Sequence, residues 1–138
     1  ANGFEVNSKL SPSNILTLMT SYTYVDKNNL EDFNDYIPKH KFLTTLEVEP
    51  FKNSFFSVTY RNVGERTLFD RYGSFGTAGS DVILPKYQVI DFMTNYKLLD
   101  DTVTFFAAVT NLLDEDYDDI LGFSTRGRNY KIGLRFQF

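Results

Sequence analysis

The densest group of potential metal ligands in this sequence is an acidic run close to its C-terminal end. The carboxylates belong to Asp114, Glu115, Asp116, Asp118 and Asp119. Neighbouring carboxylates can hold Ca²⁺, but a calcium-binding hand also requires a central glycine and a distal bidentate glutamate. The run has neither at the required spacing, so we expect a solvated loop and no metal site.

Two other features contain residue types that occur in catalytic and phosphate-binding sites. His40 is the single histidine, and no partner motif accompanies it, which argues against a catalytic triad or a zinc site. The glycine-rich stretch 73–79 lacks the Lys-Ser/Thr pair of a phosphate-binding loop. It is typical of a mobile extracellular loop. The sequence has no cysteine, so it has no thiolate ligand. We therefore predict a protein that is not an enzyme and has no catalytic residues, no metal site and no cofactor.

The composition excludes other classes of function. The net charge is −4 and the isoelectric point is near 4.9, which argues against a nucleic-acid partner. No run approaches about 18 apolar residues, so a membrane helix is not expected. The mean hydropathy of −0.28 still allows a membrane β-barrel, because alternating strands halve the average hydropathy. Aromatic residues make up 17%, all of them Phe or Tyr, and suit the aromatic girdles of such a barrel.

The chain ends on a stretch that predicts a membrane strand. Tyr130, Ile132, Leu134, Phe136 and Phe138 alternate strictly with other residues. A period of two places them on one face of a strand. Aromatic residues at the end of such a face are typical of a barrel strand that reaches the membrane interface.

Similar alternation predicts six more strands, so about seven in all. They cover approximately residues 4–10, 16–24, 42–49, 56–61, 90–98 and 103–110. Strands of roughly 9–12 residues can cross a bilayer at a tilt of about 45°, and they exceed the usual length of about 5–6 residues. Seven is odd, whereas bacterial single-chain barrels have an even number of strands. Open strand edges are not tolerated in lipid, so we expect a segment of a larger barrel.

Short and long connections alternate between these strands. Short turns are expected at 11–13, 50–53 and 99–101, and long polar loops at 26–38, 64–85 and 113–126. Outer-membrane barrels have short periplasmic turns and long extracellular loops. The predicted fold is therefore all-β, an antiparallel transmembrane β-barrel segment in the outer membrane of a Gram-negative bacterium, with a periplasmic C-terminus.

The strand phase alone allows two environments for the polar side chains. In a plugged barrel they face the lumen, whereas in a soluble two-layer protein they are exposed and the aromatic residues form the core. An autonomous small outer-membrane barrel acting as adhesin or enzyme, and a soluble lipocalin-like binder, also stay open. Strand length and the segregated loops favour the lumen. The residues concerned are Glu47, Glu49, Arg61, Asp91, Lys97, Lys131 and Arg135.

Several motifs resemble one family of receptors. Residues 111–117, N-L-L-D-E-D-Y, followed by Gly122-Phe123 and by G-R-N-Y at 127–130, resemble the C-terminal end of TonB-dependent outer-membrane receptors. Leu113 stands where Phe is common in that family. The stretches 22–26, 60–66 and 84–87 match family habits in order and spacing. The resemblance covers essentially the whole chain.

This resemblance implies a 22-stranded barrel plugged by an N-terminal domain, which imports a scarce nutrient with energy transmitted through TonB. Residues 1–138 would be the C-terminal part of the barrel. The plug domain and the TonB box would precede Ala1. The implied partners are the lipid bilayer, the rest of the barrel, the plug, TonB indirectly, and the ligand.

The order of motifs and the loop lengths are most similar to those of vitamin B12 (cobalamin) receptors. That resemblance implies ligand contacts at Tyr72 and Phe123 on the outer loops. It also implies that any calcium sites lie outside this chain. A basic residue of the family pattern near Pro38-Lys39 is replaced by proline at the matching position. Siderophore receptors share most of the terminal motif and are the alternative of the same family.

Aromatic residues near the strand ends predict a membrane-anchoring belt, because amphipathic rings prefer the membrane–water interface. The family resemblance further implies that Phe138 and its alternating partners act as a signal for insertion of the barrel. The predicted anchoring residues are Tyr22, Tyr24, Tyr60, Tyr96, Phe136 and Phe138.

Overall fold

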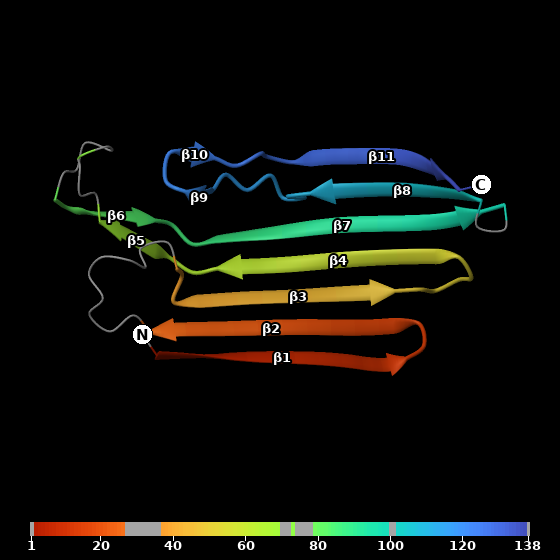
Figure 1. The fold of residues 1–138 in the computed structure, drawn as a ribbon, viewed down its shortest axis with the longest axis horizontal. Helices are drawn as coiled ribbons and strands as arrows, with labels where there is room; N and C mark the ends of the chain where they lie inside the picture. Colours follow the sequence, from red (N-terminus) through yellow and green to blue (C-terminus); the bar gives the residue numbers. More distant parts are fainter. Residues whose placement is uncertain (1, 27–36, 70–72, 74–78, 100–101, 138) are drawn as a thin grey trace.

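A computed structural model of the chain describes residues 2–26, 37–69, 73, 79–99 and 102–137, and shows one large antiparallel sheet (Figure 1). The sheet has seven strands in the order β1-β2-β3-β4-β7-β8-β11, so each long strand pairs with the next one along the chain. The seven predicted strands are thus confirmed. Their bounds are β1 (Asn2–Ser13), β2 (Leu16–Asp26), β3 (His40–Val48), β4 (Ser54–Val63), β7 (Tyr87–Leu98), β8 (Val103–Thr110) and β11 (Asn129–Phe136).

Two small hairpins lie within regions that the sequence predicts as loops. They are β5 (Arg66–Phe69) with β6 (Asp81–Leu84), and β9 (Asp118–Ile120) with β10 (Phe123–Ser124). The first continues the direction of β4 and β7 beyond the large sheet (Figure 1). Strands of two to four residues contain too few alternations to be recognised by their period.

The connections are segregated by length, as predicted. Figure 1 shows the short turns along the edge that holds the C-terminus, here called the turn rim, and the long connections along the opposite edge, here called the loop rim. The first turn lies at Asn14 and Ile15 and not at 11–13, because β1 continues through Pro12. The register shifts between Leu10 and Ser13, and such an irregularity accommodates a residue that has no N–H to donate.

The register gives the large sheet two different faces, since directly opposed residues point to the same side. On the apolar face, Phe4 opposes Tyr24 and Leu46 opposes Val58. Among the described strand residues, Asp26 at the loop rim is the only Asp, Glu, Lys or Arg at an apolar-face position. Six of the seven charged residues that the sequence predicts to face the lumen lie on the polar face, namely Glu47, Arg61, Asp91, Lys97, Lys131 and Arg135. The seventh, Glu49, follows β3 and lines a cavity with several of them.

The apolar face is not covered by protein in the described part of the chain. Ile132 is 73% exposed, and Phe4, Val6 and Leu134 are more than half exposed. The buried core is instead small and lies at the loop rim, where Val63, Tyr87 and Val89 pack together. The described residues therefore do not form the soluble two-layer arrangement in which the aromatic residues are the core. A continuous exposed apolar face of this kind requires lipid or another apolar partner.

The large sheet is open at both sides. Strands β1 and β11 are its edges and do not pair with each other. The described strands therefore form neither a closed small barrel nor a closed lipocalin-like barrel. Within the described residues, no helix is long and apolar enough to cross a membrane.

Candidate functional site

Arg66 links the two small hairpins at the loop rim. It is the first residue of β5, and only 4% of its surface is exposed. Its Nη1 donates to the carbonyl oxygen of Asp119 at 2.8 Å, and its Nη2 donates to that of Asp118 at 2.7 Å. The forked guanidinium thus binds two successive carbonyl groups of β9, a geometry that a lysine cannot reproduce.

A pair of stacked tyrosines completes this contact. The rings of Tyr87 and Tyr117 are 4.1 Å apart and nearly parallel, and the Arg66 guanidinium lies 5.3 Å from the centre of the Tyr87 ring. The Tyr87 hydroxyl donates to the Asp119 carboxylate, which is also 3.7 Å from Arg66 Nη1. Stacking and charge together fix the acidic loop onto the polar face of the sheet.

A cavity of about 340 Å³ opens beside Arg66. Three cationic side chains line this cavity, together with one carboxylate, that of Asp119. Arg61 pairs with Asp91 at 3.6 Å, whereas Lys41 forms no ion pair with a described residue. The buried Nε of Arg66 has no hydrogen-bond partner among the described residues. Lys41 therefore offers donors to an anionic or acceptor-rich ligand in this cavity. The lining consists of Pro38, Lys41, Arg61, Val63, Arg66, Tyr87, Asp119 and Ile120.

The motif N-L-L-D-E forms a tight turn after β8. Asn111 has a positive φ of 53°, and its side chain both donates to the Glu115 carbonyl and accepts from the Glu115 N–H, at 2.8 and 2.9 Å. The Asp91 carboxylate accepts a hydrogen bond from the Asn111 N–H at 2.8 Å. The pair of Asp91 and Arg61 thus connects the turn to the middle strands of the sheet.

The same turn also binds the chain just before the last strand. The Asp114 carboxylate accepts a hydrogen bond from the Arg128 N–H at 2.7 Å. A side chain at Gly127 would place its Cβ 2.9 Å from that carboxylate oxygen, so glycine permits the close approach. A hydrogen bond with Tyr130 raises the pKa of the exposed Arg128 guanidinium above its ordinary value, so Arg128 stays charged. We call these contacts the β8–β11 clamp.

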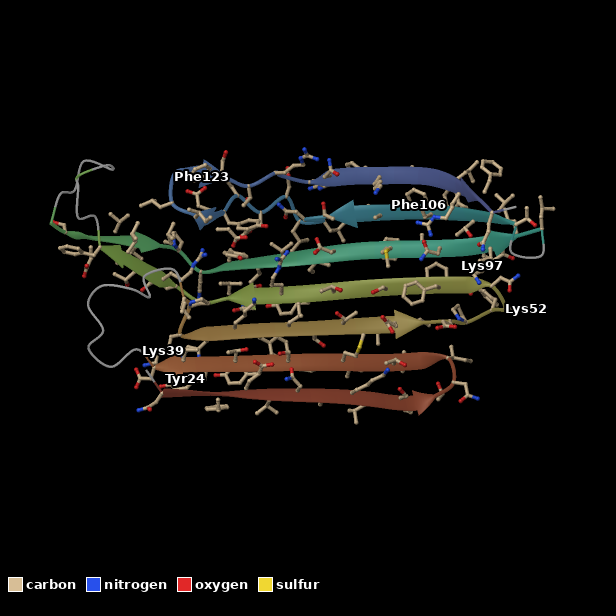
Figure 2. All side chains as sticks on the ribbon, viewed as in Figure 1. Tyr24, Lys39, Lys52, Lys97, Phe106 and Phe123 are labelled. Atoms are coloured by element: carbon tan, nitrogen blue, oxygen red, sulfur yellow. The ribbon has the colours of Figure 1, made fainter. Side chains whose placement is uncertain are left out.

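The two predicted ligand contacts stay predictions, and the structure describes the position of one of them. Phe123 is the first residue of β10 at the loop rim, with 70% of its surface exposed (Figure 2). Tyr72 lies outside the described residues. The cationic cavity was not predicted, because Lys41, Arg61, Arg66 and Asp119 are far apart in the sequence and share no motif.

The predicted anchoring residues lie in two bands of the apolar face. Tyr22, Tyr24 and Tyr60 are near the loop rim, and Tyr96 and Phe136 are near the turn rim. Ring contacts connect the first band, with Phe4 5.5 Å from Tyr24 and 5.9 Å from Tyr22 between ring centres. The single histidine is part of this band, since His40 Nδ1 is 2.8 Å from the Tyr22 hydroxyl. Phe138 lies outside the described residues.

The acidic run takes part in hydrogen bonds in the described part of the chain. No group of three or more His, Asp and Glu side chains there is arranged to hold a metal ion. Asp114 and Asp119 instead accept the hydrogen bonds from Arg128 and Tyr87 described above.

Comparison with known proteins identifies the family. The profile described as "TonB dependent receptor-like, beta-barrel" matches residues 1–112. The chain belongs to the TonB-dependent receptor family, as the motifs at its C-terminal end predicted. This is a family of transport receptors, and its members are outer-membrane proteins.

Two curated relatives come from Vibrio cholerae. The chain is 31% identical to the vitamin B12 transporter BtuB over 88 residues, which cover 64% of this chain and 14% of that protein. It is 30% identical to the iron-regulated outer membrane virulence protein over 144 aligned residues, which cover 99% of this chain and 21% of that protein. The chain thus spans about a fifth or less of the length of the relatives it matches.

Solved structures show the same fold at low identity. The ferripyoverdine receptor of the outer membrane of Pseudomonas aeruginosa superposes with a TM-score of 0.79 at 16% identity, over 99% of this chain and 19% of that one. The ferric-catecholate import receptor Fiu of Escherichia coli superposes with a TM-score of 0.77 at 20% identity, over 99% of this chain and 20% of that one. The sheet is therefore a segment of a TonB-dependent receptor barrel.

Proposed function

We propose that this chain forms the C-terminal wall of an outer-membrane receptor that imports a scarce nutrient with energy supplied through TonB. The observation that carries the proposal is the division of the sheet into two faces, one apolar and exposed, the other polar and charged. Lipid on one side and a hydrated lumen on the other account for both faces. The segregated connections support the same arrangement.

The proposed orientation puts the loop rim outside the cell and the turn rim, with the C-terminal end of β11, in the periplasm. Further strands of the same polypeptide pair with β1 and β11, since unpaired backbone groups are not tolerated in lipid. A barrel of 22 strands, a plug domain and a TonB box complete the receptor outside residues 1–138. Tyr22, Tyr24, Tyr60, Tyr96, Phe136 and Phe138 act as interfacial anchors in this arrangement.

Cobalamin is the first candidate ligand. The order of motifs in the sequence resembles cobalamin receptors, and one relative is named as a vitamin B12 transporter. In this proposal Phe123 and Tyr72 contact the ligand from the outer loops. The strong exposure of the Phe123 ring at the loop rim is consistent with that role.

A ferric siderophore is the second candidate, and the cationic cavity is the observation that favours it. Lys41, which has no ion-pair partner among the described residues, offers donors to an anionic iron chelate, and Arg61 and Arg66 add positive charge beside it. The relative aligned over 99% of the chain is named as iron-regulated. Cobalamin carries no comparable negative charge, so the positive charge of the cavity favours a siderophore over cobalamin.

The test is uptake by the receptor, expressed with any flanking polypeptide that its gene encodes, in a Gram-negative strain lacking its own cobalamin and siderophore receptors. Labelled cobalamin and labelled ferric siderophores are compared with and without TonB. TonB-dependent uptake of one ligand supports the proposal and identifies the nutrient. Uptake that is unchanged by loss of TonB, or a purified receptor that binds neither ligand class, contradicts it.

For the residue assignments, Phe123→Ala is expected to weaken ligand binding whichever ligand is transported. Lys41→Gln is expected to weaken binding of an anionic siderophore and to leave binding of cobalamin unchanged. Equal binding by both variants and the unchanged receptor would contradict the assigned contacts. The readout is the ligand dissociation constant of the detergent-purified receptor.

A further inference from the structure

Asp119 supplies the single carboxylate among the described residues that line the cavity beside Arg66. Its Oδ1 accepts the hydrogen bond from the Tyr87 hydroxyl and lies 3.7 Å from Arg66 Nη1. Tyr87 and Arg66 line the same cavity. A carboxylate of the chain itself therefore already occupies the place where these two donors could hold an anionic group of a ligand.

This carboxylate is held more loosely than the backbone beside it. The Asp119 side chain is 53% exposed, whereas that of Arg66 is 4% exposed. The two hydrogen bonds of the Arg66 guanidinium go to the carbonyl oxygens of Asp118 and Asp119, so they do not depend on the carboxylate. An ion pair that is half exposed is weak, because water screens it. Turning the carboxylate into water therefore costs little and leaves β9 bound to Arg66.

A second cation lies across the cavity from this group. In the register of the sheet, Lys41 opposes Val63, and Val63 opposes Tyr87. The three residues thus form one row on the polar face, with the backbones of Lys41 and Tyr87 about 10 Å apart, or two strand spacings. Lys41 forms no ion pair with a described residue. The cavity therefore has a position for a second anionic group, beyond the one that Asp119 fills.

These two positions determine which anions can enter. A ligand with a single carboxylate would only exchange one carboxylate for another, and Asp119 competes with it from the same chain at a high effective concentration. The two carboxylates cannot share the position, because like charges side by side repel each other. A ligand with two or more anionic groups can replace Asp119 and bind Lys41 as well.

We propose that Asp119 is a specificity-determining residue, an internal anion that a ligand must displace, so that the cavity selects ligands with at least two anionic groups. This inference rests on the proposed function, because it concerns a ligand that enters from the loop rim. For the siderophore candidate it names a narrower chemical class, the polyanionic chelates. The displaced carboxylate turns into water, and the Tyr87 hydroxyl donates to the ligand in its place.

The experiment measures binding of citrate and of acetate to the complete, detergent-purified receptor by calorimetry at low ionic strength. Citrate is the probe with several carboxylates, and acetate is the probe with one. Asp119→Asn removes the charge but keeps an oxygen that can accept from Tyr87. Asp116→Asn is the matched control, because Asp116 is an exposed carboxylate of the same loop and does not line the cavity.

We expect Asp119→Asn to bind citrate about tenfold more tightly than the unchanged receptor, because a competing like charge is gone. Asp116→Asn should bind citrate as the unchanged receptor does. Acetate should bind the unchanged receptor far more weakly than citrate.

Amide hydrogen exchange separates this role from a structural one. If Asp119 only held β9 in place, Asp119→Asn would speed exchange in residues 117–125. We expect a change of less than about threefold, because the hydrogen bonds from Arg66 to the backbone remain. If Asp119→Asn does not fold, Asp119→Ala takes its place. Failure of both variants to fold overturns the proposal, since the carboxylate would then be required by the fold.

Citrate binding that is weaker or unchanged in Asp119→Asn, or tightened equally in Asp116→Asn, overturns the proposal. So does acetate that binds the unchanged receptor as tightly as citrate, or a receptor that binds no citrate in either form. Tighter citrate binding in Asp119→Asn of a receptor without TonB-dependent uptake would support the role of Asp119 and contradict only the proposed function. TonB-dependent uptake together with citrate binding that ignores Asp119→Asn would contradict only this inference.

Discussion

At the scale of single residues, Arg66 shows why a buried cation is tolerated at the loop rim. Two carbonyl oxygens, an aromatic face and a carboxylate replace the water that it loses. Each of these partners belongs to another segment of the chain, so one side chain joins β5, β7 and β9. The arrangement depends on the planar fork of the guanidinium and not only on its charge.

Arg66→Lys tests that dependence. Lysine keeps the charge but cannot reach both carbonyl groups, so β9 should open more often. We expect amide hydrogen exchange in residues 117–125 to become roughly 10–100-fold faster, which corresponds to the loss of about 1.5–3 kcal/mol for hydrogen bonds to a charged group. Lys41→Gln, which alters the same cavity without touching β9, is the control. Unchanged exchange in Arg66→Lys would show that charge alone fixes the loop.

At the scale of elements, the β8–β11 clamp gives a physical reason for the motifs that mark the family. Asn111 shapes the turn, and Asp114 binds the backbone of Arg128 beside Gly127, where a Cβ would lie 2.9 Å from the Asp114 carboxylate oxygen. The N-L-L-D-E motif and the G-R-N-Y motif are separated in the sequence but meet in one contact. The clamp therefore sets where β11 begins and supports its register with β8.

Replacing Asn111 separates the side-chain contacts from the backbone conformation. Asn111→Gly keeps the positive φ at no steric cost but loses both side-chain hydrogen bonds, whereas Asn111→Ala also strains the backbone. We expect the free energy of unfolding to fall by about 1–3 kcal/mol in the glycine variant and by roughly 1 kcal/mol more in the alanine variant. Urea titrations of the receptor in lipid vesicles measure both values. Equal losses would mean that the positive φ contributes no strain.

The strands were predictable because a period of two is sustained over eight to twelve residues, and such a pattern fixes both the element and its phase. Phe106 and Gly133 lie on the polar face, as the alternation predicts. Neither an aromatic ring nor a glycine would identify that face on its own. The site was less predictable. Arg66 contacts β9 over more than fifty residues, and no local pattern encodes such a contact. The ligand contact at Phe123 came from resemblance and stays a prediction.

At the scale of the whole molecule, the two faces determine where the protein can reside. Adjacent positions of one strand alternate between an apolar and a polar environment across all seven strands. Bands of aromatic residues lie near both rims, and the zone between them contains Phe92 and aliphatic side chains such as Val58, Leu46 and Ile132. This profile matches the depth profile of a bilayer.

A pair of neighbouring substitutions tests the assignment of the faces. Val58→Lys places a charge in the middle of the apolar face, and Thr59→Lys places the same charge on the polar face. We expect Val58→Lys to destabilise the receptor in lipid vesicles by about 2–4 kcal/mol, and Thr59→Lys to cost far less. Urea-induced unfolding, followed by tyrosine fluorescence or circular dichroism, gives the free energy of unfolding of both variants. A larger loss for Thr59→Lys would exchange the two faces.

Because the number of long strands is odd, the two ends of the segment lie on opposite rims, with Asn2 at the loop rim and Phe136 at the turn rim (Figure 1). An antibody epitope inserted beside Asn2 should be stained on intact cells. One inserted after Phe136 should be stained only once the outer membrane has been permeabilised. Staining of both epitopes on intact cells would contradict the proposed orientation. Epitopes at these two positions of a single chain would therefore report on opposite sides of the same membrane.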